Sequence, residues 1–401
     1  MAPGIRMYPG EGDSSVDGKM TRREFLEKCA ACGLALGVVP FMGGLDTIES
    51  ICMGLVGAGG MSDRVASYYT PASGNAVKCT LCPNYCVLQP GASGGCRVRQ
   101  NSGGRLYSRV YGYTARVRGD AMEKGPFFHY LPGTSSVALG TVGCNLHCLY
   151  CQNWEFTQIA PQDLNPSPQY LPPTSLVAQA KKYGRPTIIF TYSEPIIAIE
   201  YVMETARLAK QSGIRTLVKS AGYINPEPMK ALCQAVDAIN IDFKAYSSSF
   251  YQNVCGGTLN PVLDAITTAH KYAPWLELTY MTVPGYNDSA NQFTQVCQWI
   301  KQNIGTRVPL HISRFFPSYR LRNLAATPID KLRELRKIAY DQGLQYVYLG
   351  NLQGDPGEST YCPKCGVKVI KRIGYNVQLL ALNPSTGKCT VCGLKIPGVW
   401  S

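Results

Sequence analysis

Charged residues are scarce in this 401-residue chain, and long hydrophobic runs are scarce too. Only 16% of the residues are charged, whereas 45% are apolar. This composition excludes a disordered or tail-like polycation, because a chain so rich in apolar residues can bury a large core. The length predicts one large domain of about 250 residues with smaller appendages.

The few charges are unevenly distributed along the chain. Lys and Arg number 39 and Asp and Glu number 26, so the formal net charge is +13. Residues 78–124 and residues 362–401 each carry +6, which accounts for nearly all of this excess. A basic patch ordinarily suggests nucleic acid, an acidic partner or anionic lipid. The same two segments, however, are rich in cysteine.

Cysteine is abundant, with 17 residues that fall mainly into three clusters. Pairs spaced Cys-x2-Cys do not readily form disulfides with each other, and a chain with a large core does not need disulfides for its stability. Metal ligation therefore explains these pairs better. Soft thiolates select zinc or iron–sulfur clusters. The clusters are Cys79, Cys82, Cys86 and Cys96; Cys144, Cys148 and Cys151; and Cys362, Cys365, Cys389 and Cys392.

The N-terminal region resembles an export signal. Arg22 and Arg23 precede an uncharged run of 17 residues, 29–45, as in a twin-arginine signal. A short amphipathic or buried helix is one alternative, and a retained membrane tether is another, although the run is marginal for a membrane span. We predict a signal or tether at 1–53 and, from its small residues, a linker at 54–77.

Apolar, strand-like runs alternate with amphipathic helical stretches between residues 125 and 350. This alternation predicts parallel βα units in an α/β fold, arranged as an open sheet or a barrel. We predict a partial six-stranded (β/α)6 TIM-type barrel at 125–350, with small cysteine-rich metal-binding modules at 78–124 and 351–401. Strand-like runs occupy 137–142, 187–192, 215–220, 238–242, 276–283, 309–315 and 345–349, and helical stretches include 196–212, 261–272, 291–304 and 329–342.

The central cluster, Cys144-x3-Cys148-x2-Cys151, follows a predicted strand. In parallel α/β folds the carboxyl ends of the strands build the active site. Three thiolates bind three irons of a 4Fe-4S cluster and leave the fourth iron open to a ligand, whereas a closed electron-transfer cluster uses four cysteines. A zinc site completed by His147 or a distant ligand is the alternative.

With these motifs the sequence resembles the radical S-adenosylmethionine (SAM) superfamily. More narrowly, it resembles the radical SAM enzyme of the AmmeMemoRadiSam system, which is related to pyruvate formate-lyase activating enzymes. The resemblance extends from about Cys79 to Ser401. It implies that one electron from a 4Fe-4S cluster cleaves SAM into methionine and a 5′-deoxyadenosyl radical that abstracts hydrogen. The matching segments include 79–86, 140–154, 240–246 and 350–354.

The resemblance also implies positions that bind SAM. The segment 191–195 stands where the superfamily has the Gly-Gly-Glu-Pro sequence that holds the SAM amino group. Asp242 and Lys244 resemble the Asp-x-Lys pair of the activating enzymes, in which the lysine contacts the SAM carboxylate; an ordinary salt bridge is the alternative. Gly285 belongs to a turn that borders the adenine, and an ordinary tight turn would look the same. The implied SAM ligands are Tyr150, Thr191, Ser193, Glu194, Asp242, Lys244 and Gly285, with Asp242 and Lys244 as catalytic candidates.

The two flanking cysteine sets are predicted to bind metal. The C-terminal set forms two Cys-x2-Cys knuckles, each followed by a glycine that permits a tight turn, as in zinc ribbons. Zinc is the preferred metal there, with an auxiliary iron–sulfur cluster as the alternative. For the N-terminal set, zinc and a second, auxiliary 4Fe-4S cluster both stay open. Four thiolates around either metal group sum to about −2, so the local positive charge is compensating and nucleic acid becomes a weaker hypothesis.

We therefore expect a radical SAM enzyme that uses SAM and a low-potential electron donor of the flavodoxin or ferredoxin type. Its substrate is either a partner protein that receives a glycyl radical, or some other protein, an RNA or a small molecule. A non-catalytic electron-transfer or nucleic-acid-binding metalloprotein is the hypothesis from a different class. The chemistry favours the cytoplasm, whereas the N-terminus favours export or membrane tethering, so the localisation stays open.

Overall fold

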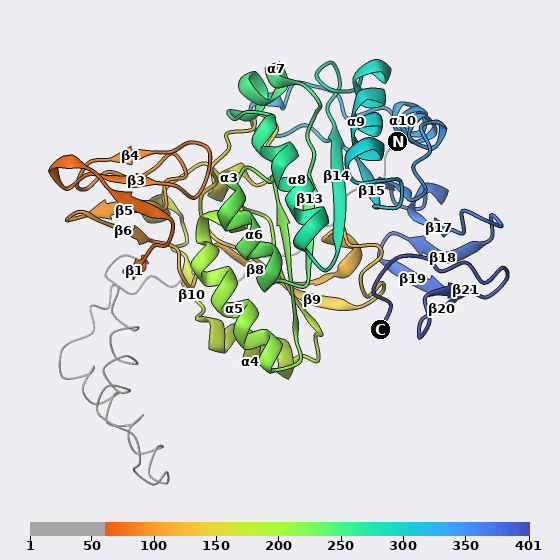
Figure 1. Ribbon diagram of the computed structural model, residues 1–401, viewed down its shortest axis with the longest axis horizontal. Coiled ribbons are helices and arrows are strands. Elements are labelled where there is room, and N and C mark those ends of the chain that lie inside the picture. The colour runs from red at the N-terminus through yellow and green to blue at the C-terminus, as the bar shows by residue number, and fades with distance from the viewer. Residues whose placement is uncertain (1–60) are drawn as a thin grey trace, which may run out of the picture. The chain divides into compact units, whose positions relative to one another are not determined.

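A large, mostly parallel sheet lies at the centre of the fold (Figure 1). The computed structural model describes residues 61–401, and in this part of the chain the sheet has eight strands in the order β16-β15-β14-β13-β12-β11-β9-β8. Neighbouring strands are parallel except β8 and β9, which are antiparallel. The strands are β8 (Arg116–Ala121), β9 (Ser135–Gly140), β11 (Thr187–Phe190), β12 (Arg215–Ser220), β13 (Ala238–Asp242), β14 (Leu276–Thr282), β15 (Leu310–Arg314) and β16 (Val347–Gly350).

The seven predicted strand positions are confirmed, but the predicted count of six strands is wrong. Seven parallel strands make up the sheet, and β8 adds an antiparallel eighth at its edge. Four of the six β8 residues are charged or glycine and the other two are one valine and one alanine, so no apolar run marks β8 as a strand. Since β8 lies within 78–124, the boundary predicted at 124 cuts off a strand of the main sheet.

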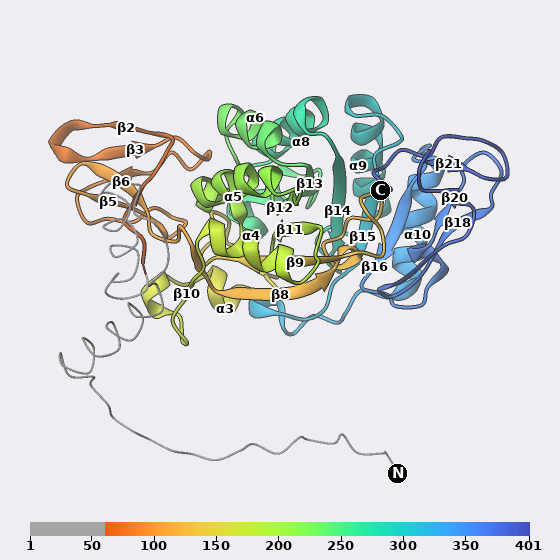
Figure 2. The same ribbon diagram turned by 90° about the horizontal axis from the view of Figure 1, so that it is seen from below.

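The helices between these strands lie along one face of the curved sheet (Figure 2). Their buried residues recur at helical spacing, as Val202, Ala206 and Ala209 do on α5. The four predicted helices are confirmed, although α5 begins three residues later than expected because a 3-10 turn, η4, precedes it. The helices are α3 (Trp154–Thr157), α4 (Pro173–Lys182), α5 (Ile199–Gln211), α6 (Pro226–Ala235), α7 (Ser248–Phe250), α8 (Asn260–Tyr272), α9 (Ala290–Asn303) and α10 (Ile329–Asp341).

Short helical turns and a two-stranded ribbon complete the connections. The single π turn η5 (Tyr251–Cys255) continues directly from α7, and it packs against the loop that follows β9. The ribbon pairs β7 (Tyr113–Thr114) with β10 (Gln169–Tyr170). The 3-10 turns are η1 (Ser73–Asn75), η2 (Met122–Lys124), η3 (Pro161–Asp163), η4 (Pro195–Ala198), η6 (Tyr319–Leu321) and η7 (Pro356–Glu358).

The N-terminal module consists of two small antiparallel sheets. The buried Arg99 on β5 fastens it to α5 through an ion pair with Glu200, at 3.0 Å. The linker predicted at 54–77 is wrong for its described part, because β1 pairs with β6 and β2 pairs with β3. These strands are too short to leave a periodic pattern. The strands are β1 (Arg64–Val65), β2 (Tyr69–Pro71), β3 (Val77–Cys79), β4 (Val87–Leu88), β5 (Arg99–Ser102) and β6 (Arg105–Ser108).

The C-terminal module packs against the segment between β8 and β9 through the buried residue Arg372. Its guanidinium donates to the Phe128 carbonyl at 2.6 Å and lies 4.2 Å from the centroid of the Phe128 ring. An ion pair with the buried Glu123, at 3.4 Å, completes the attachment. The strands of this module are β17 (Thr360–Tyr361), β18 (Lys368–Ile373), β19 (Asn376–Leu379), β20 (Leu382–Asn383) and β21 (Lys388–Cys389).

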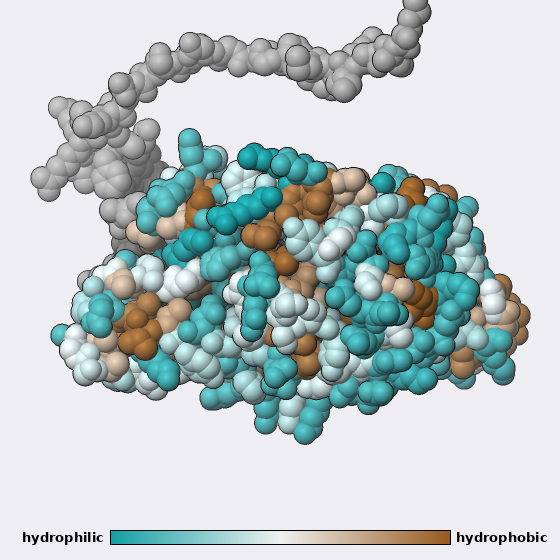
Figure 3. Space-filling model, turned by 90° about the horizontal axis from the view of Figure 1, so that it is seen from above, coloured by the Kyte–Doolittle hydropathy of each residue, from teal (hydrophilic) through white to brown (hydrophobic). Residues whose placement is uncertain are grey.

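The signal or tether predicted at 1–53 lies outside the described residues. Among residues 61–401, no helix is both long and apolar enough to cross a membrane. The face of the molecule in Figure 3 is mainly hydrophilic, with smaller hydrophobic patches between polar areas. The larger apolar side chains are mostly buried in the core between the sheet and its helices.

Candidate active site

A cavity of about 800 Å³ lies at the carboxyl ends of the parallel strands. This is the end at which α/β sheets place their catalytic residues. Of the predicted ligands of SAM and of the central cluster, all except Gly285 line this cavity. Those on its wall are Cys144, Cys148, Tyr150, Cys151, Thr191, Ser193, Glu194, Asp242 and Lys244, joined by Lys219 and His311.

The three central cysteines sit on the loop between β9 and α3, which is held from behind by the π turn η5. The amide of His147 donates to the Cys255 carbonyl at 2.7 Å, and the amide of Leu149 donates to the Val254 carbonyl at 2.9 Å. Cys255 itself is fully buried behind the loop.

The polar surroundings of the thiols suit thiolate ligands. The amide of Leu146 donates to the Cys144 sulfur at 3.4 Å, and the Thr157 hydroxyl shares a hydrogen bond with the Cys151 sulfur at 3.3 Å. Burial raises the pKa of the Cys144 thiol well above its ordinary value, whereas a bound metal ion favours the thiolate form. His147, the alternative zinc ligand, is not on the cavity wall and contacts Gln158 at 3.1 Å.

The segment after β11 explains a departure from the superfamily sequence. Tyr192 adopts a positive φ of 65°, a conformation that favours glycine, and it stands where Gly-Gly-Glu-Pro has a glycine. Its hydroxyl donates to Asp120, and its carbonyl accepts from Asn153 at 2.8 Å. Ser193 accepts a hydrogen bond from the Thr141 amide at 3.1 Å. These contacts hold the strained tyrosine in the conformation that a glycine would adopt freely.

The Glu194 carboxylate is buried and accepts hydrogen bonds from three neighbouring groups. Its carboxylate accepts from the Ser220 hydroxyl and the Ala221 amide, each at 2.7 Å, and from the Ile196 amide at 3.3 Å. Burial raises the pKa of this carboxyl above its ordinary value. Glu194 therefore fixes the end of β12 beside the cavity, and a carboxylate with four acceptor positions keeps capacity for one more donor.

Asp242 bridges two lysines at the ends of β12 and β13. Its carboxylate lies 2.5 Å from Lys219 Nζ and 3.2 Å from Lys244 Nζ. Burial alone would raise the pKa of Asp242, but the two lysines outweigh it and lower that pKa to about 2. The trio therefore carries a net positive charge at neutral pH, which suits an anionic ligand group such as a carboxylate. Sequence reasoning missed Lys219, although its place at a strand end was the available signal.

Tyr150 is buried beside Lys244. The Lys244 ammonium lies 5.8 Å from the centroid of its ring, and the Tyr150 hydroxyl lies 3.9 Å from the Cys255 sulfur. Gly285, by contrast, lies in the turn after β14, where its amide donates to Asp288 at 2.9 Å, and it does not line the cavity. Gly285 therefore lies in a tight turn, and its predicted contact with SAM stays a prediction.

His311 on β15 is one of the residues that line the cavity. Its Nε2 lies 2.6 Å from the Glu277 carboxylate, which also accepts from the Phe128 and His129 amides and from the Trp275 indole. His311 Nδ1 is buried and has no hydrogen-bond partner among the described residues. Burial lowers the pKa of the imidazole. A neutral His311 that donates from Nε2 therefore offers Nδ1 as an acceptor.

Comparison with known proteins identifies the family. The sequence model of the radical SAM superfamily matches residues 139–297. The chain is 39% identical over 333 residues to an uncharacterized protein of Methanocaldococcus jannaschii, a match that spans 83% of this chain and 98% of that protein. The chain belongs to the radical SAM superfamily.

More distant members of the superfamily match parts of the chain. GTP 3′,8-cyclase of Limosilactobacillus fermentum is 28% identical over 149 residues, which span 36% of this chain and 44% of the cyclase. The crystal structure of a radical SAM methyltransferase from Sphaerobacter thermophilus covers 84% of this chain and 97% of its own, with 12% identity and a TM-score of 0.46.

Membership in the radical SAM superfamily makes this chain an enzyme and implies SAM and a 4Fe-4S cluster as its cofactors. The donor set fits this cofactor, because three thiols from one short loop line a cavity of about 800 Å³. Separately, the four C-terminal cysteines have sulfurs that all lie within 4.8 Å of one another, as a metal site requires.

Proposed function

We propose that Cys144, Cys148 and Cys151 hold the 4Fe-4S cluster and that the enzyme abstracts hydrogen from a substrate bound in the same cavity. The observation that carries this proposal is the meeting of the three thiols and the Asp242–lysine trio on one cavity wall. When bound, the cluster supplies the electron that splits SAM into methionine and a hydrogen-abstracting radical. A low-potential donor of the flavodoxin or ferredoxin type supplies that electron to the protein.

The residues of the chain then bind and orient SAM. Lys244 carries a positive charge beside the cysteine loop and is placed to contact the SAM carboxylate, while Asp242 holds the ammonium group in position. Tyr150 packs beneath the lysine and shields it. A closed and dry pocket suits this chemistry, because a primary carbon radical attacks almost any nearby C–H bond.

Replacing Lys244 with alanine is expected to weaken SAM binding about 10- to 100-fold, because a hydrogen bond to a charged group contributes about 1.5–3 kcal/mol. Equilibrium binding of SAM to the anaerobically reconstituted protein measures this effect. Lys210, an exposed lysine on α5, is the matched control, and its alanine variant should bind SAM as the parent does. Parent-like affinity in the Lys244 variant would remove Lys244 from the SAM site.

We further propose that the substrate is a protein that receives a glycyl radical. Pyruvate formate-lyase-activating enzyme of Clostridium pasteurianum is 21% identical over 207 residues, which span 49% of this chain and 86% of that enzyme. The alternatives are radical modification of another protein, an RNA or a small molecule. Incubation of the reduced holoenzyme with SAM and candidate partner proteins tests this: a glycyl-radical signal on the partner supports it, and modification of a different class of molecule contradicts it.

The C-terminal cysteines are proposed to bind one zinc ion. Cys362 and Cys392 sulfurs lie 3.5 Å apart, and Cys365 and Cys389 sulfurs lie 3.8 Å apart. A tetrahedral zinc site with Zn–S distances of about 2.3 Å places its sulfurs about 3.8 Å apart, so the spacing fits. The glycine after each knuckle has a positive φ and donates its amide to the first cysteine carbonyl of that knuckle, which closes the expected tight turn.

A Cys365→Ser variant should lose about one zinc per chain while the central cluster stays intact, because the two sites belong to separate modules. Zinc quantification together with the visible absorption of the iron–sulfur chromophore checks both halves of this expectation. Cys233→Ala, which removes a buried thiol on α6, is the control and should keep the zinc. Simultaneous loss of zinc and of the central chromophore from the Cys365 variant would contradict the modular arrangement.

A further inference from the structure

The N-terminal cysteines take no part in the function described above. We propose that Cys79, Cys82, Cys86 and Cys96 hold a second iron–sulfur cluster, through which electrons reach the central cysteine loop. The metal assignment does not depend on the proposed function. The electron-relay role does rest on the proposed function.

The fold gathers these four thiols at one end of the β3–β4 hairpin. The amide of Cys79 donates to the Cys86 carbonyl at 2.9 Å, which closes the loop between β3 and β4. A methyl group built on Gly94 would lie 3.6 Å from the Cys86 sulfur and 3.7 Å from the Cys96 sulfur. The glycine therefore leaves open the space between these two thiols. Cys82 is also buried, so three of the four thiols are shielded from solvent.

The spacing of the sulfurs distinguishes a cluster from a single zinc ion. Among residues 61–401, the C-terminal set is the group of three or more candidate ligands whose atoms all lie within 4.8 Å of one another. In the described part of the chain, neither the N-terminal thiols nor those of the central loop form so compact a group. Four irons separate the thiolates of a cubane, whereas one zinc ion draws them together. The N-terminal set therefore resembles the central set, and not the C-terminal one, in lacking that compact arrangement.

The N-terminal thiols lie directly against the loop that carries the central ones. The Asn84 amide, between Cys82 and Cys86, donates to the Asn145 carbonyl at 3.0 Å. A Cβ on Gly143 would lie 2.5 Å from the Cys96 carbonyl oxygen, so only a glycine permits this approach. Since Asn145 and Gly143 flank Cys144, the backbones of the two cysteine sets are in contact.

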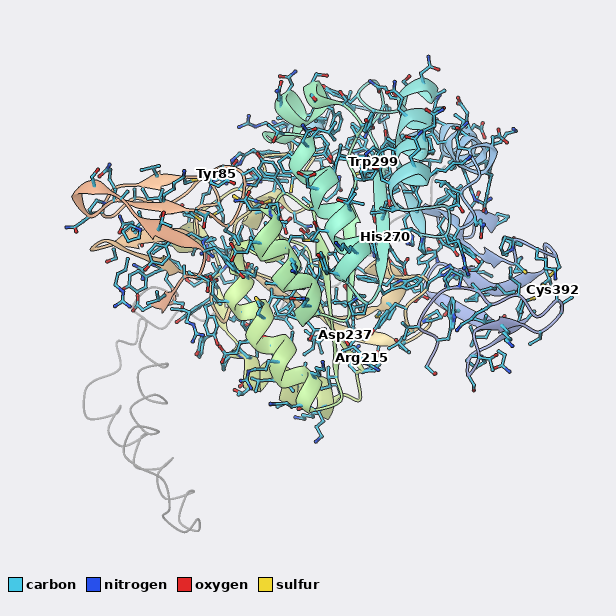
Figure 4. The ribbon with its side chains drawn as sticks, viewed as in Figure 1. Tyr85, Arg215, Asp237, His270, Trp299 and Cys392 are labelled. Carbon is cyan, nitrogen blue, oxygen red and sulfur yellow. The ribbon has the colours of Figure 1, made fainter. Side chains whose placement is uncertain are left out.

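The outer edge of the module gives an electron donor access to this site. Cys86 is partly exposed and stands between two exposed apolar side chains, Tyr85 at 47% and Val87 at 60%. Tyr85 and Cys392 lie on opposite sides of the barrel (Figure 4), so this edge is remote from the C-terminal module. A docked flavodoxin- or ferredoxin-type donor would transfer one electron to the N-terminal cluster. The N-terminal cluster would then transfer this electron to the central cluster. No bond is made or broken in this transfer.

Metal analysis of the full-length, anaerobically reconstituted protein tests the metal assignment. The parent protein should contain about eight irons and eight sulfides, and a variant with Cys144, Cys148 and Cys151 all replaced by alanine should keep about four of each. Cys96→Ser should lose the other four irons. If the triple variant contains no iron and the parent contains two zinc ions, one of them lost from Cys96→Ser, the proposal is wrong. The triple variant decides the question even if Cys96→Ser does not fold.

The relay role has a separate test. In Cys96→Ser, formation of 5′-deoxyadenosine should be lost with a flavodoxin-type donor and should persist with dithionite, a small reductant that reaches the central cluster directly. If Cys96→Ser keeps the same fraction of the parent rate with both reductants, the proposed relay is wrong. Absence of 5′-deoxyadenosine from the parent with every reductant would instead refute the proposed function, and the metal counts would still decide whether the second cluster exists.

Discussion

Replacing Cys148 with alanine is expected to abolish reductive SAM cleavage, with a fall of about 100-fold or more. Changes to groups that merely support a metal ligand cost about 10- to 100-fold, so loss of a ligand should cost at least as much. Cys148 is the middle thiol of the loop and lines the cavity. The measurement is the initial rate of 5′-deoxyadenosine formation under strictly anaerobic, reducing conditions, together with the iron content of the variant.

Cys297→Ala supplies the matched control for this experiment. Cys297 is a fully buried thiol on α9, and it does not line the cavity. Its alanine variant removes the same atoms from the core, so a loss caused by packing alone would appear there too. A Cys148 variant that forms 5′-deoxyadenosine at the parent rate would show that this thiol is not a cluster ligand.

Glu277→Ala is expected to destabilise the fold by about 3–5 kcal/mol, the largest stability effect that we predict. The side chain is completely buried and accepts four hydrogen bonds, from two backbone amides, an indole and His311. Removing the Glu277 carboxylate leaves these buried donors without an acceptor. Urea unfolding of the reconstituted protein measures the change, with Glu227→Ala, an exposed position on α6, as the control. A change below about 1 kcal/mol, as for an ordinary surface residue, would contradict this account.

The same interior predicts that acid destabilises the protein. Burial lowers the pKa of His129 from 6.5 to about 4, and it lowers the pKa of His311 as well. Between pH 6.5 and 4 the unfolded chain therefore binds protons that the folded chain does not, so stability falls as the pH falls, by about 1.4 kcal/mol per pH unit for His129. Glu277 acts in the same direction, because its hydrogen bonds outweigh burial and lower its pKa.

The parallel strands were predictable because burial on both faces leaves a continuous apolar run. The β13 sequence Ala-Ile-Asn-Ile-Asp is apolar at three of the four positions before the strand end, where Asp242 lines the cavity. Edge strand β8 leaves no such run, because its three charged residues line the cavity and its place is fixed by backbone hydrogen bonds to β9. Pairing partners distant in sequence have no local signal.

Some residues of the candidate site were likewise predictable from the sequence, and others were not. The cysteine positions were predictable because ligands on one short loop must keep a fixed spacing. Lys219 was not, because its role depends on lying beside Asp242 on the neighbouring strand, 23 residues away in the chain. The link between Glu277 and His311 joins β14 to β15, and the free ring nitrogen of His311 follows from it. Register between strands, rather than residue type, decides these contacts.

The most direct test of the central claim is the product analysis of the reconstituted, reduced protein mixed with SAM. We predict equal amounts of methionine and 5′-deoxyadenosine, formed only with the reductant present and only with an intact set of Cys144, Cys148 and Cys151. If a protein that carries its full iron and sulfide forms neither product under these conditions, the account of this cavity as a site of reductive SAM cleavage is contradicted.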